Sequence, residues 1–309
     1  MNERYYFIIN PMSGSHLDVT GLKKLCQWLK EQGKYVRVDL TESMEHVGQL
    51  TSRAIAENAT TVIAAGGDGT IRTVIDAMAG SEIPILIVPS GTENLLAGEV
   101  GLDGSIETTA NTLLNGKIQK IDLGNANNIH FMAITGVGFD AEVVKRVHYN
   151  RRGHITHTNY IRPLVQTFLE HKFPYLTVEI DGEIVCNEPA MAFVSNISRY
   201  AVGLGIAKEA KMGDGFLDVT IFKCRGKRQL AKHAINTVLN RDGVNTIRQK
   251  CKKVIISSPQ ENVYTQIDGD PGPQLPLKIE VIPAAARLLV PPGDMTPVRY
   301  YHLKKWFLR

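Results

Sequence analysis

Small, polar and glycine residues follow three expected strands in the first half of the chain, each time just before an expected helix. The three stretches are Asn10-Pro11-Met12-Ser13-Gly14, Gly66-Gly67-Asp68-Gly69-Thr70 and Pro89-Ser90-Gly91-Thr92. Glycine lets a backbone approach a phosphate group closely, and the first amides of a helix carry unpaired N–H groups that attract an anion. The pattern predicts a site for a phosphate ester, although the same glycines could simply make tight turns between strand and helix.

Asp68 is unexpected in an anion-binding loop because its carboxylate repels phosphate. Its presence predicts a divalent metal ion or a substrate hydroxyl nearby. Two common nucleotide-binding signatures are missing from the sequence, GxxxxGK[ST] and GxGxxG. The chain is therefore neither an ordinary P-loop NTPase nor a dinucleotide-binding protein of the usual type.

The elements that must position these loops alternate regularly. Apolar runs predict strands at Tyr5–Ile9, Val36–Leu40, Thr61–Ala65 and Ile83–Val88, and residues with helical spacing follow each of them. This βαβαβαβα order predicts an α/β domain with a parallel sheet, whose ligands bind at the carboxyl ends of the strands.

The second half has shorter intervals between strand-like segments, with helix-like stretches only near 155–170 and 227–239. Asp181-Gly182 is typical of a hairpin turn between two strands. We therefore expect a nucleotide-binding domain over 1–124, a mainly antiparallel β domain over 125–290, and a C-terminal tail over 291–309 that packs back on the first domain.

Charge is divided unevenly along the 309 residues. Residues 1–124 carry a net charge of −5 and residues 125–309 a net charge of +9. The basic half invites an anionic partner, which is a lipid surface, a nucleic acid or a phosphorylated substrate. No apolar run approaches the roughly 20 residues of a membrane-spanning helix, and the four cysteines form no CxxC pair, so we expect a cytoplasmic protein.

The stretch VIAAGGDGTIRTVIDAM, followed by IPILIVPSGTENLLA, closely resembles the diacylglycerol kinase catalytic family, which includes bacterial diacylglycerol kinases and sphingosine kinase-like lipid kinases. TGVGFDAEVVKRV, AKMGDGFLDVTIF and IDGD follow in the family's order. NAD kinases share GGDGT, but the PxGTxN and DGxLDV elements favour the lipid kinases. The resemblance implies an N-terminal domain like that of NAD kinase and phosphofructokinase, with ATP and Mg²⁺ as cofactors.

The resemblance also implies which residues contact ATP. They lie in or beside the strand-end loops and are Asn10, Pro11, Ser13, Gly14, Thr41, Gly66, Gly67, Asp68, Gly69, Thr70, Arg72, Gly91, Thr92 and Asn94. Arg72 either neutralises phosphate charge or is an ordinary solvated helix residue. The family's Asn-Asp pair is Asn94-Leu95 here, which implies altered substrate contacts or weaker activity.

The segment 211–216 aligns with the family's magnesium-linked loop. The resemblance implies that Asp214 supplies a carboxylate and that the backbone carbonyls of Lys211 and Phe216 hold the loop or the metal. The alternative is a plain Gly-Asp-Gly turn before the strand that begins at Leu217.

The family takes its catalytic base from a late Asp-Gly-Glu sequence. Asp181-Gly182-Glu183 matches by letter but is interpreted as a hairpin turn, whereas Asp268-Gly269-Asp270 matches by position. We therefore expect Asp268 or Asp270 to take the proton of the acceptor hydroxyl, and the sequence leaves open which of the two does so.

Basic and aromatic residues mix in two places, from Lys145 to Lys172 and in the last twelve residues, VRYYHLKKWFLR. Such mixtures suit an anionic membrane surface, but the aromatic residues could equally pack on the protein. No nucleic-acid-binding motif accompanies them. We expect a lipid substrate, peripheral attachment to an anionic membrane and no nucleic acid; the oligomeric state stays open, a homodimer included.

These observations together predict an ATP-dependent lipid kinase that phosphorylates a hydroxyl of a diacylglycerol-like or sphingoid lipid. Two alternatives remain at this point. One is an NAD kinase-like phosphotransferase, because of the shared GGDGT. The other is a catalytically weak lipid-binding regulatory module, because Leu95 and Asp270 depart from the family pattern.

Overall fold

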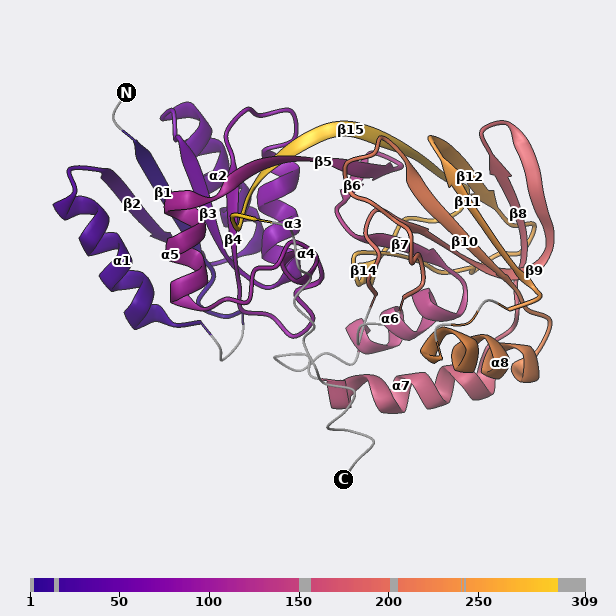
Figure 1. Ribbon diagram of the computed structural model, residues 1–309. Coiled ribbons are helices and arrows are strands. Elements are labelled where there is room, and N and C mark those ends of the chain that lie inside the picture. Colours follow the sequence, from indigo (N-terminus) through magenta and orange to yellow (C-terminus); the bar gives the residue numbers. More distant parts are fainter. Residues whose placement is uncertain are drawn as a thin grey trace. The chain divides into compact units, whose positions relative to one another are not determined.

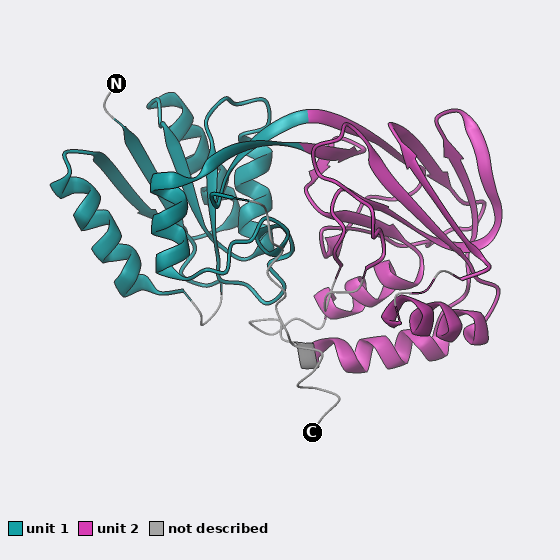
Figure 2. Cartoon of the chain, viewed as in Figure 1, with its two compact units in different colours: residues 1–121, 284–309 teal, residues 122–283 magenta. Residues whose placement is uncertain are grey.

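The computed structural model describes residues 3–13, 17–149, 157–200, 205–239, 241 and 243–293. The chain forms two compact units (Figure 2), which we call unit 1 (the described residues of 3–121 and 284–293) and unit 2 (those of 122–283). The boundaries differ from the expected ones because the last strand, β15 (Leu277–Val290), ends beside a strand of unit 1. The expected packing of the tail falls mostly on residues 294–309, which lie outside the described residues.

Unit 1 contains the predicted parallel sheet. Its strands are β1 (Arg4–Ile9), β2 (Tyr35–Leu40), β3 (Thr61–Gly66) and β4 (Ile85–Pro89), in the spatial order β4-β3-β1-β2 (Figure 1). The end of β15 runs parallel to β4, with Leu288 opposite Ile85. The three central strands read as continuous apolar runs because both faces of the sheet are covered.

Five helices accompany this sheet: α1 (Val19–Glu31), α2 (Met44–Ala56), α3 (Asp68–Ala77), α4 (Leu95–Glu99) and α5 (Ile106–Asn115). Helix α1 packs beside α5, and α2 packs beside α3 (Figure 1). Three of them begin at a side chain that accepts a backbone N–H, as helix starts generally do: Asp18 for α1, Ser43 for α2 and Ser105 for α5.

The strand order places a topological switch point between β1 and β3. The chain leaves β1 for β2 on one side, and then returns to form β3 on the other side of β1. In open α/β sheets the loops on either side of such a point diverge and leave room for a ligand. The loops that begin at Asn10 and at Gly67 follow these two strands.

Unit 2 is mainly antiparallel, as expected. Its sheet path runs β14-β13-β7-β9-β8-β12-β15, and β10 with β11 continues from β9. The strands are β6 (Ile129–Phe131), β7 (Ile134–Val137), β8 (Tyr175–Ile180), β9 (Glu183–Ser195), β10 (Leu217–Lys223), β11 (Thr246–Cys251), β12 (Lys253–Ser257), β13 (Thr265–Ile267) and β14 (Asp270–Pro271), with β5 (Lys117–Ala126) entering from unit 1.

Strand β9 takes part in two layers of unit 2. Its first half pairs with β8, and its second half, from Ala190, pairs with β7 and β10. The apolar side chains of these layers form one core, with Phe131, Val178 and Ile256 among its fully buried members. Three helices complete the unit: α6 (Phe139–Tyr149), α7 (His157–Glu170) and α8 (Lys227–Val238). In the part of the chain that the structure describes, no helix is both long and apolar enough to cross a membrane.

Candidate active site

The three glycine-containing loops meet at the carboxyl ends of β1, β3 and β4. The amide of Asn10 donates to the hydroxyl of Thr70 (Nδ2–Oγ1, 2.9 Å), which joins the loops after β1 and β3 across the switch point. The hydroxyls of Ser13 and Ser90 share a hydrogen bond of 2.7 Å, which joins the loops after β1 and β4. Several hydroxyl and amide donors are therefore held within one small region. Ser90 belongs to the third loop, but we did not expect it among the site residues.

The glycines of these loops are required by close packing. A Cβ atom on Gly91 would lie 2.8 Å from the Cα atom of Gly67, and one on Gly66 would lie 2.5 Å from the Cβ atom of Thr70. Both distances are too short for real side chains. Gly69 differs, since a Cβ atom there would come no closer than 3.9 Å to Met44. Tight packing thus accounts for Gly66 and Gly91 but leaves Gly69 open to a ligand.

Asp68 joins the second and third loops. Its two carboxylate oxygens each accept one backbone N–H at the start of α4, from Asn94 (2.9 Å) and from Leu95 (2.9 Å). Asn94 has the left-handed backbone conformation (φ 50°), and its side chain closes the turn through Gly91. The acid therefore neutralises the positive end of α4, which gives it a structural reason to lie in an anion-binding loop.

Helix α3 begins at Asp68 with Gly67 as its N-cap, and no side chain caps it. The first amides of a helix have no partner inside the helix, so this end suits a phosphate group. The other predicted contacts differ in exposure: Thr41 is buried, Arg72 is half-buried and Thr92 is exposed. Gly14 lies outside the described residues.

Replacing Gly91 by alanine is expected to push the third loop away from the second. Overpacking of this kind costs about 1–3 kcal/mol of folding stability. If ATP must restore the original loop spacing on binding, its affinity falls by up to roughly 5- to 150-fold. Isothermal titration with a non-hydrolysable ATP analogue measures the loss. Gly48→Ala in α2 is the control, since a Cβ atom at Gly48 meets nothing within 4 Å; equal affinities of the two variants would contradict the prediction.

Asp268, one of the two candidate bases, is held by three backbone amides. Its Oδ1 atom accepts from Ala133 (3.0 Å) and Ile134 (2.9 Å), and its Oδ2 atom accepts from Met132 (2.9 Å). Hydrogen bonds of this kind stabilise the charged carboxylate and make it a weaker proton acceptor. The geometry therefore gives Asp268 the role of fixing the chain between β6 and β7.

The two Asp-Gly sequences of unit 2 form the same kind of turn. Asp181 and Gly182 have φ values of 48° and 95°, and Asp268 and Gly269 have φ values of 47° and 85°. Both pairs therefore make a two-residue hairpin turn with left-handed residues at both positions. A hairpin turn therefore does not distinguish Asp181-Gly182-Glu183 from Asp268-Gly269-Asp270 as the source of the base. Asp270, opposite Ile267 at the end of the second turn, is half-buried.

A half-buried acid behind this hairpin, whose Oδ2 atom is fully buried, was missed in the sequence. Asp140, at the start of α6, accepts the hydroxyl of Tyr200. Its carboxylate and the side-chain amide of Gln266 both line the space beside Gly136, where a Cβ atom would come within 3.1 and 3.0 Å of them. Gln266 in turn accepts the backbone N–H of Gly269 (2.9 Å). Burial raises the pKa of Asp140 to about 6, although the hydrogen bond from Tyr200 partly opposes that rise.

The raised pKa makes stability depend on pH. Between its ordinary value of 3.8 and about 6, the folded chain binds the proton more tightly than the unfolded chain does. The free energy of unfolding therefore falls as the pH rises from 3.8 to about 6. Above this range the ionised Asp140 carboxylate lowers it by at most roughly 3 kcal/mol. Asp140→Asn should raise the free energy of unfolding at neutral pH and lose this gain in acid. Urea unfolding of the variant at neutral and at acidic pH tests this. Asp76→Asn is the control, because Asp76 is exposed.

The loop 211–216 is closed by hydrogen bonds from both sides. Buried Asp122 of β5 donates its backbone N–H to the Met212 carbonyl (2.6 Å) and accepts the Gly215 N–H on its side chain (2.7 Å). Asp214 accepts the Phe216 N–H on Oδ1 (3.1 Å), and its Oδ2 atom forms an ion pair with Lys250. The Lys211 carbonyl accepts the Gly213 N–H (2.8 Å). The Asp214 carboxylate and the Lys211 carbonyl thus accept donors here, while the buried Oδ2 atom of Asp218 has no hydrogen-bond partner. The magnesium-linked role of this loop stays a prediction.

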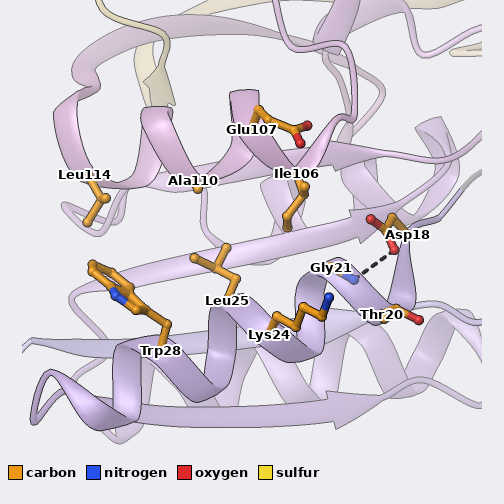
Figure 3. A pocket seen from close by; sticks show the side chains of 10 residues that line it. All are labelled: Asp18, Thr20, Gly21, Lys24, Leu25, Trp28, Ile106, Glu107, Ala110 and Leu114. Atoms are coloured by element: carbon orange, nitrogen blue, oxygen red, sulfur yellow. Dashed lines mark hydrogen bonds between the residues drawn. The ribbon is translucent and has the colours of Figure 1, made fainter.

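Two hollows lie apart from the residues discussed above. One of about 540 Å³ lies between α1 and α5 of unit 1, with Leu25, Trp28 and Leu114 on its walls (Figure 3). The other, of about 800 Å³, lies in unit 2, where the ammonium group of Lys145 stands 3.5 Å from the centre of the Tyr264 ring. None of the residues predicted to bind ATP or metal, or to act as a base, lines either hollow.

Both units match known protein families. Residues 4–126 match the model of the diacylglycerol kinase catalytic domain. Residues 133–290 match the model described as the YegS C-terminal NAD kinase beta sandwich-like domain. The two matches together define a class of two-domain kinases.

Similar proteins place the chain within that class. A protein of Mycobacterium tuberculosis (strain CDC 1551 / Oshkosh) named diacylglycerol kinase is 30% identical, over 92% of this chain and 94% of that protein. A Staphylococcus aureus (strain JH9) protein of the same name is 25% identical, over 89% of each chain. A crystal structure of a diacylglycerol kinase from Bacillus anthracis str. Sterne aligns with a TM-score of 0.72 and 22% identity, over 94% of this chain and 97% of that one. The chain belongs to the diacylglycerol kinase family and is a lipid kinase.

Proposed function

We propose that this protein transfers the γ-phosphoryl group of ATP to a hydroxyl of a diacylglycerol-like or sphingoid lipid at an anionic membrane surface. The observation that carries the proposal is the joining of three strand-end loops by the Asn10–Thr70, Ser13–Ser90 and Asp68–Asn94 hydrogen bonds. Relatives named diacylglycerol kinase support the choice of lipid.

In this proposal unit 1 binds the triphosphate. The uncapped start of α3 and the hydroxyls of Ser13 and Thr70 are donors for phosphate oxygens. The hydrogen bonds of Thr70 with Asn10 and of Ser13 with Ser90 hold these hydroxyls in place before ATP arrives. Positioned donors of this kind matter because phosphoryl transfer depends mainly on alignment and charge neutralisation. A divalent metal ion bound with the nucleotide supplies further positive charge to the phosphates.

Asp270 of unit 2 is the proposed proton acceptor. It takes the proton of the lipid hydroxyl, whose oxygen forms a bond to the γ-phosphorus while the bond from that phosphorus to the β–γ bridging oxygen breaks. ADP leaves with the bridging oxygen. Asp268 is less suited to this role because three amides already stabilise its charge.

An apolar stripe on α7 supports action at a membrane. Four large apolar side chains at positions i, i+3, i+4 and i+8 of one helix face are exposed: Ile161, Leu164, Val165 and Leu169. Exposed apolar side chains at helical spacing suit insertion among lipid headgroups, and the net charge of +9 over residues 125–309 favours an anionic surface. The basic tail would add to this, although residues 294–309 lie outside the described residues.

Transfer of radiolabelled phosphate from ATP to diacylglycerol, sphingosine and NAD tests the proposal. We expect label in one of the lipids, supplied in anionic phospholipid vesicles, and none in NAD. Label in NAD alone would support the NAD kinase-like alternative. The absence of label in every acceptor, together with sedimentation of the protein with the vesicles, would support the regulatory module.

A further inference from the structure

We propose that the corner where α8 leads into β11 binds the surface of an anionic phospholipid bilayer, as a contact separate from the stripe on α7. We call this place the α8 corner and define it by four apolar residues: Ile235, Val238, Leu239 and Val244. The inference rests on the proposed function and deepens it, because it names a second part of the chain that touches the same membrane.

The α8 corner places aliphatic side chains in water. Ile235, Val238 and Leu239 lie at positions i, i+3 and i+4, so they share one face at the end of α8. Each of them is more than half exposed, and Val244, just before β11, is 95% exposed. Single exposed apolar side chains are common, but four of them at one end of a helix indicate a surface that contacts something apolar.

The opposite face of α8 holds the helix on unit 2. Leu230 and His233 are its buried residues. The Nε2 atom of His233 donates to the carbonyl of Lys223 (2.9 Å), and the centre of its ring lies 5.0 Å from that of Phe222. Lys223 and Phe222 both belong to β10, so a core strand fixes which face of α8 points outward (Figure 1).

Cations accompany the outward face. Residues 227–242 carry four cations and one acid, Asp242, which gives a net charge of +3. The cations are all exposed and are Lys227, Arg228, Lys232 and Arg241. Two neighbouring cations, Lys223 and Arg225, already pair with Glu188. Among the described residues, the four outward cations have no such acid partner, and this excess of positive charge favours an anionic surface.

The order of side chains along α8 favours a bilayer over a uniformly apolar partner. Arg228, Lys232, Ile235 and Leu239 lie at positions i, i+4, i+7 and i+11, which is one line along the helix. The line begins with cations and ends with aliphatic side chains. A membrane interface has the same order, with phosphate headgroups outside and acyl chains beneath them. A helix that enters with its C-terminal end first would therefore match both zones.

Binding to phospholipid vesicles without ATP tests the proposal, with phosphatidylserine mixed into phosphatidylcholine. The double variant Ile235→Ser/Leu239→Ser should bind these vesicles about 10-fold more weakly or worse, because serine loses the apolar surface that enters the acyl chains. Lys232→Gln should bind about 5-fold more weakly, and only when phosphatidylserine is present. Because all three side chains are exposed, the unfolding temperature should stay unchanged.

Matched controls come from elsewhere in unit 2. Ile184→Ser removes an equally exposed apolar side chain, but one that follows the acid Glu183. Lys253→Gln removes an exposed cation whose backbone N–H donates to Asp181 (2.8 Å). An acid beside each of these positions disfavours contact with an anionic surface, so we expect both variants to bind the vesicles as the wild type does.

Two results would overturn the proposal. One is a double variant that binds the vesicles as tightly as the wild type, or no more weakly than Ile184→Ser. The other is self-association of the wild type without vesicles that the double variant abolishes, which would assign the α8 corner to a second copy of the chain. Vesicle binding uses neither ATP nor the substrate lipid, so an inactive kinase would leave this result standing, and failure here would leave the kinase reaction standing.

Discussion

Asp270→Asn is expected to lower the rate of phosphoryl transfer by about 10²- to 10⁴-fold, the usual contribution of a positioned proton acceptor. The asparagine keeps the size of the side chain but cannot take the hydroxyl proton. Its effect should fall on kcat rather than on KM for ATP, because the nucleotide is bound by the loops of unit 1 in the proposed reaction. Steady-state kinetics with ATP and vesicle-borne diacylglycerol measure both quantities.

The matched control is Glu183→Gln. Glu183 holds the same place after Asp181-Gly182 that Asp270 holds after Asp268-Gly269, and it is exposed. We expect its loss of charge to leave the rate unchanged. A large loss of rate in Glu183→Gln together with a normal rate in Asp270→Asn would transfer the role of base to the other turn.

Asp268→Ala is expected to destabilise unit 2 by roughly 3 kcal/mol or more, because three backbone N–H groups each lose a charged acceptor worth about 1–3 kcal/mol. Alanine also fits poorly at a φ of 47°, which costs a further 1–2 kcal/mol or so. Amide hydrogen exchange reads the effect directly, since protection should fall at Met132, Ala133 and Ile134.

Asp268→Asn separates structure from catalysis at the same position. Asparagine keeps an acceptor oxygen and tolerates a positive φ, as Asn58, Asn127 and Asn262 do elsewhere in the chain. We expect partial protection of the three amides and a rate well above that of Asp270→Asn. A fully folded Asp268→Asn variant as inactive as Asp270→Asn would instead make Asp268 the base.

The strands of unit 1 could be predicted because the parallel sheet is covered on both faces and its strands are continuous apolar runs. Helix α5 could not be predicted in this way. Two of its buried residues are Thr109 and Thr112, whose hydroxyls donate to the carbonyls of Ser105 and Thr108 four residues earlier. These local hydrogen bonds allow polar side chains at positions where a periodicity argument expects apolar ones.

Strand β11 could not be predicted either, because it carries exposed polar residues rather than buried ones. It lies at the end of the β9-β10-β11 ladder, and three of its six residues are exposed. Polar residues at the edge of a sheet leave no apolar alternation to find. In the sequence, the single strand β15 reads as two apolar segments, 277–282 and 288–290, because Pro283 and the alanines after it interrupt the apolar pattern.

At the candidate active site, the chemistry of the loops could be predicted but the partners of the charged residues could not. Glycines and hydroxyls at strand ends are local patterns. The role of Asp68 depends on amides 26 and 27 residues further along the chain, and the position of Lys250 opposite Asp218 depends on a ladder register. Asp140 was missed because nothing near it in the sequence distinguishes an acid with a buried carboxylate oxygen from an ordinary first-turn acid of a helix.

The return of β15 to unit 1 has a consequence for biosynthesis. When residues 1–121 have left the ribosome, β4 has β3 on one side but still lacks Leu288 and its neighbours on the other. An unpaired strand edge of this kind invites association with other nascent chains. A gene cut after codon 121 would therefore yield a fragment prone to aggregation, and supplying residues 284–293 as a separate peptide should improve its recovery.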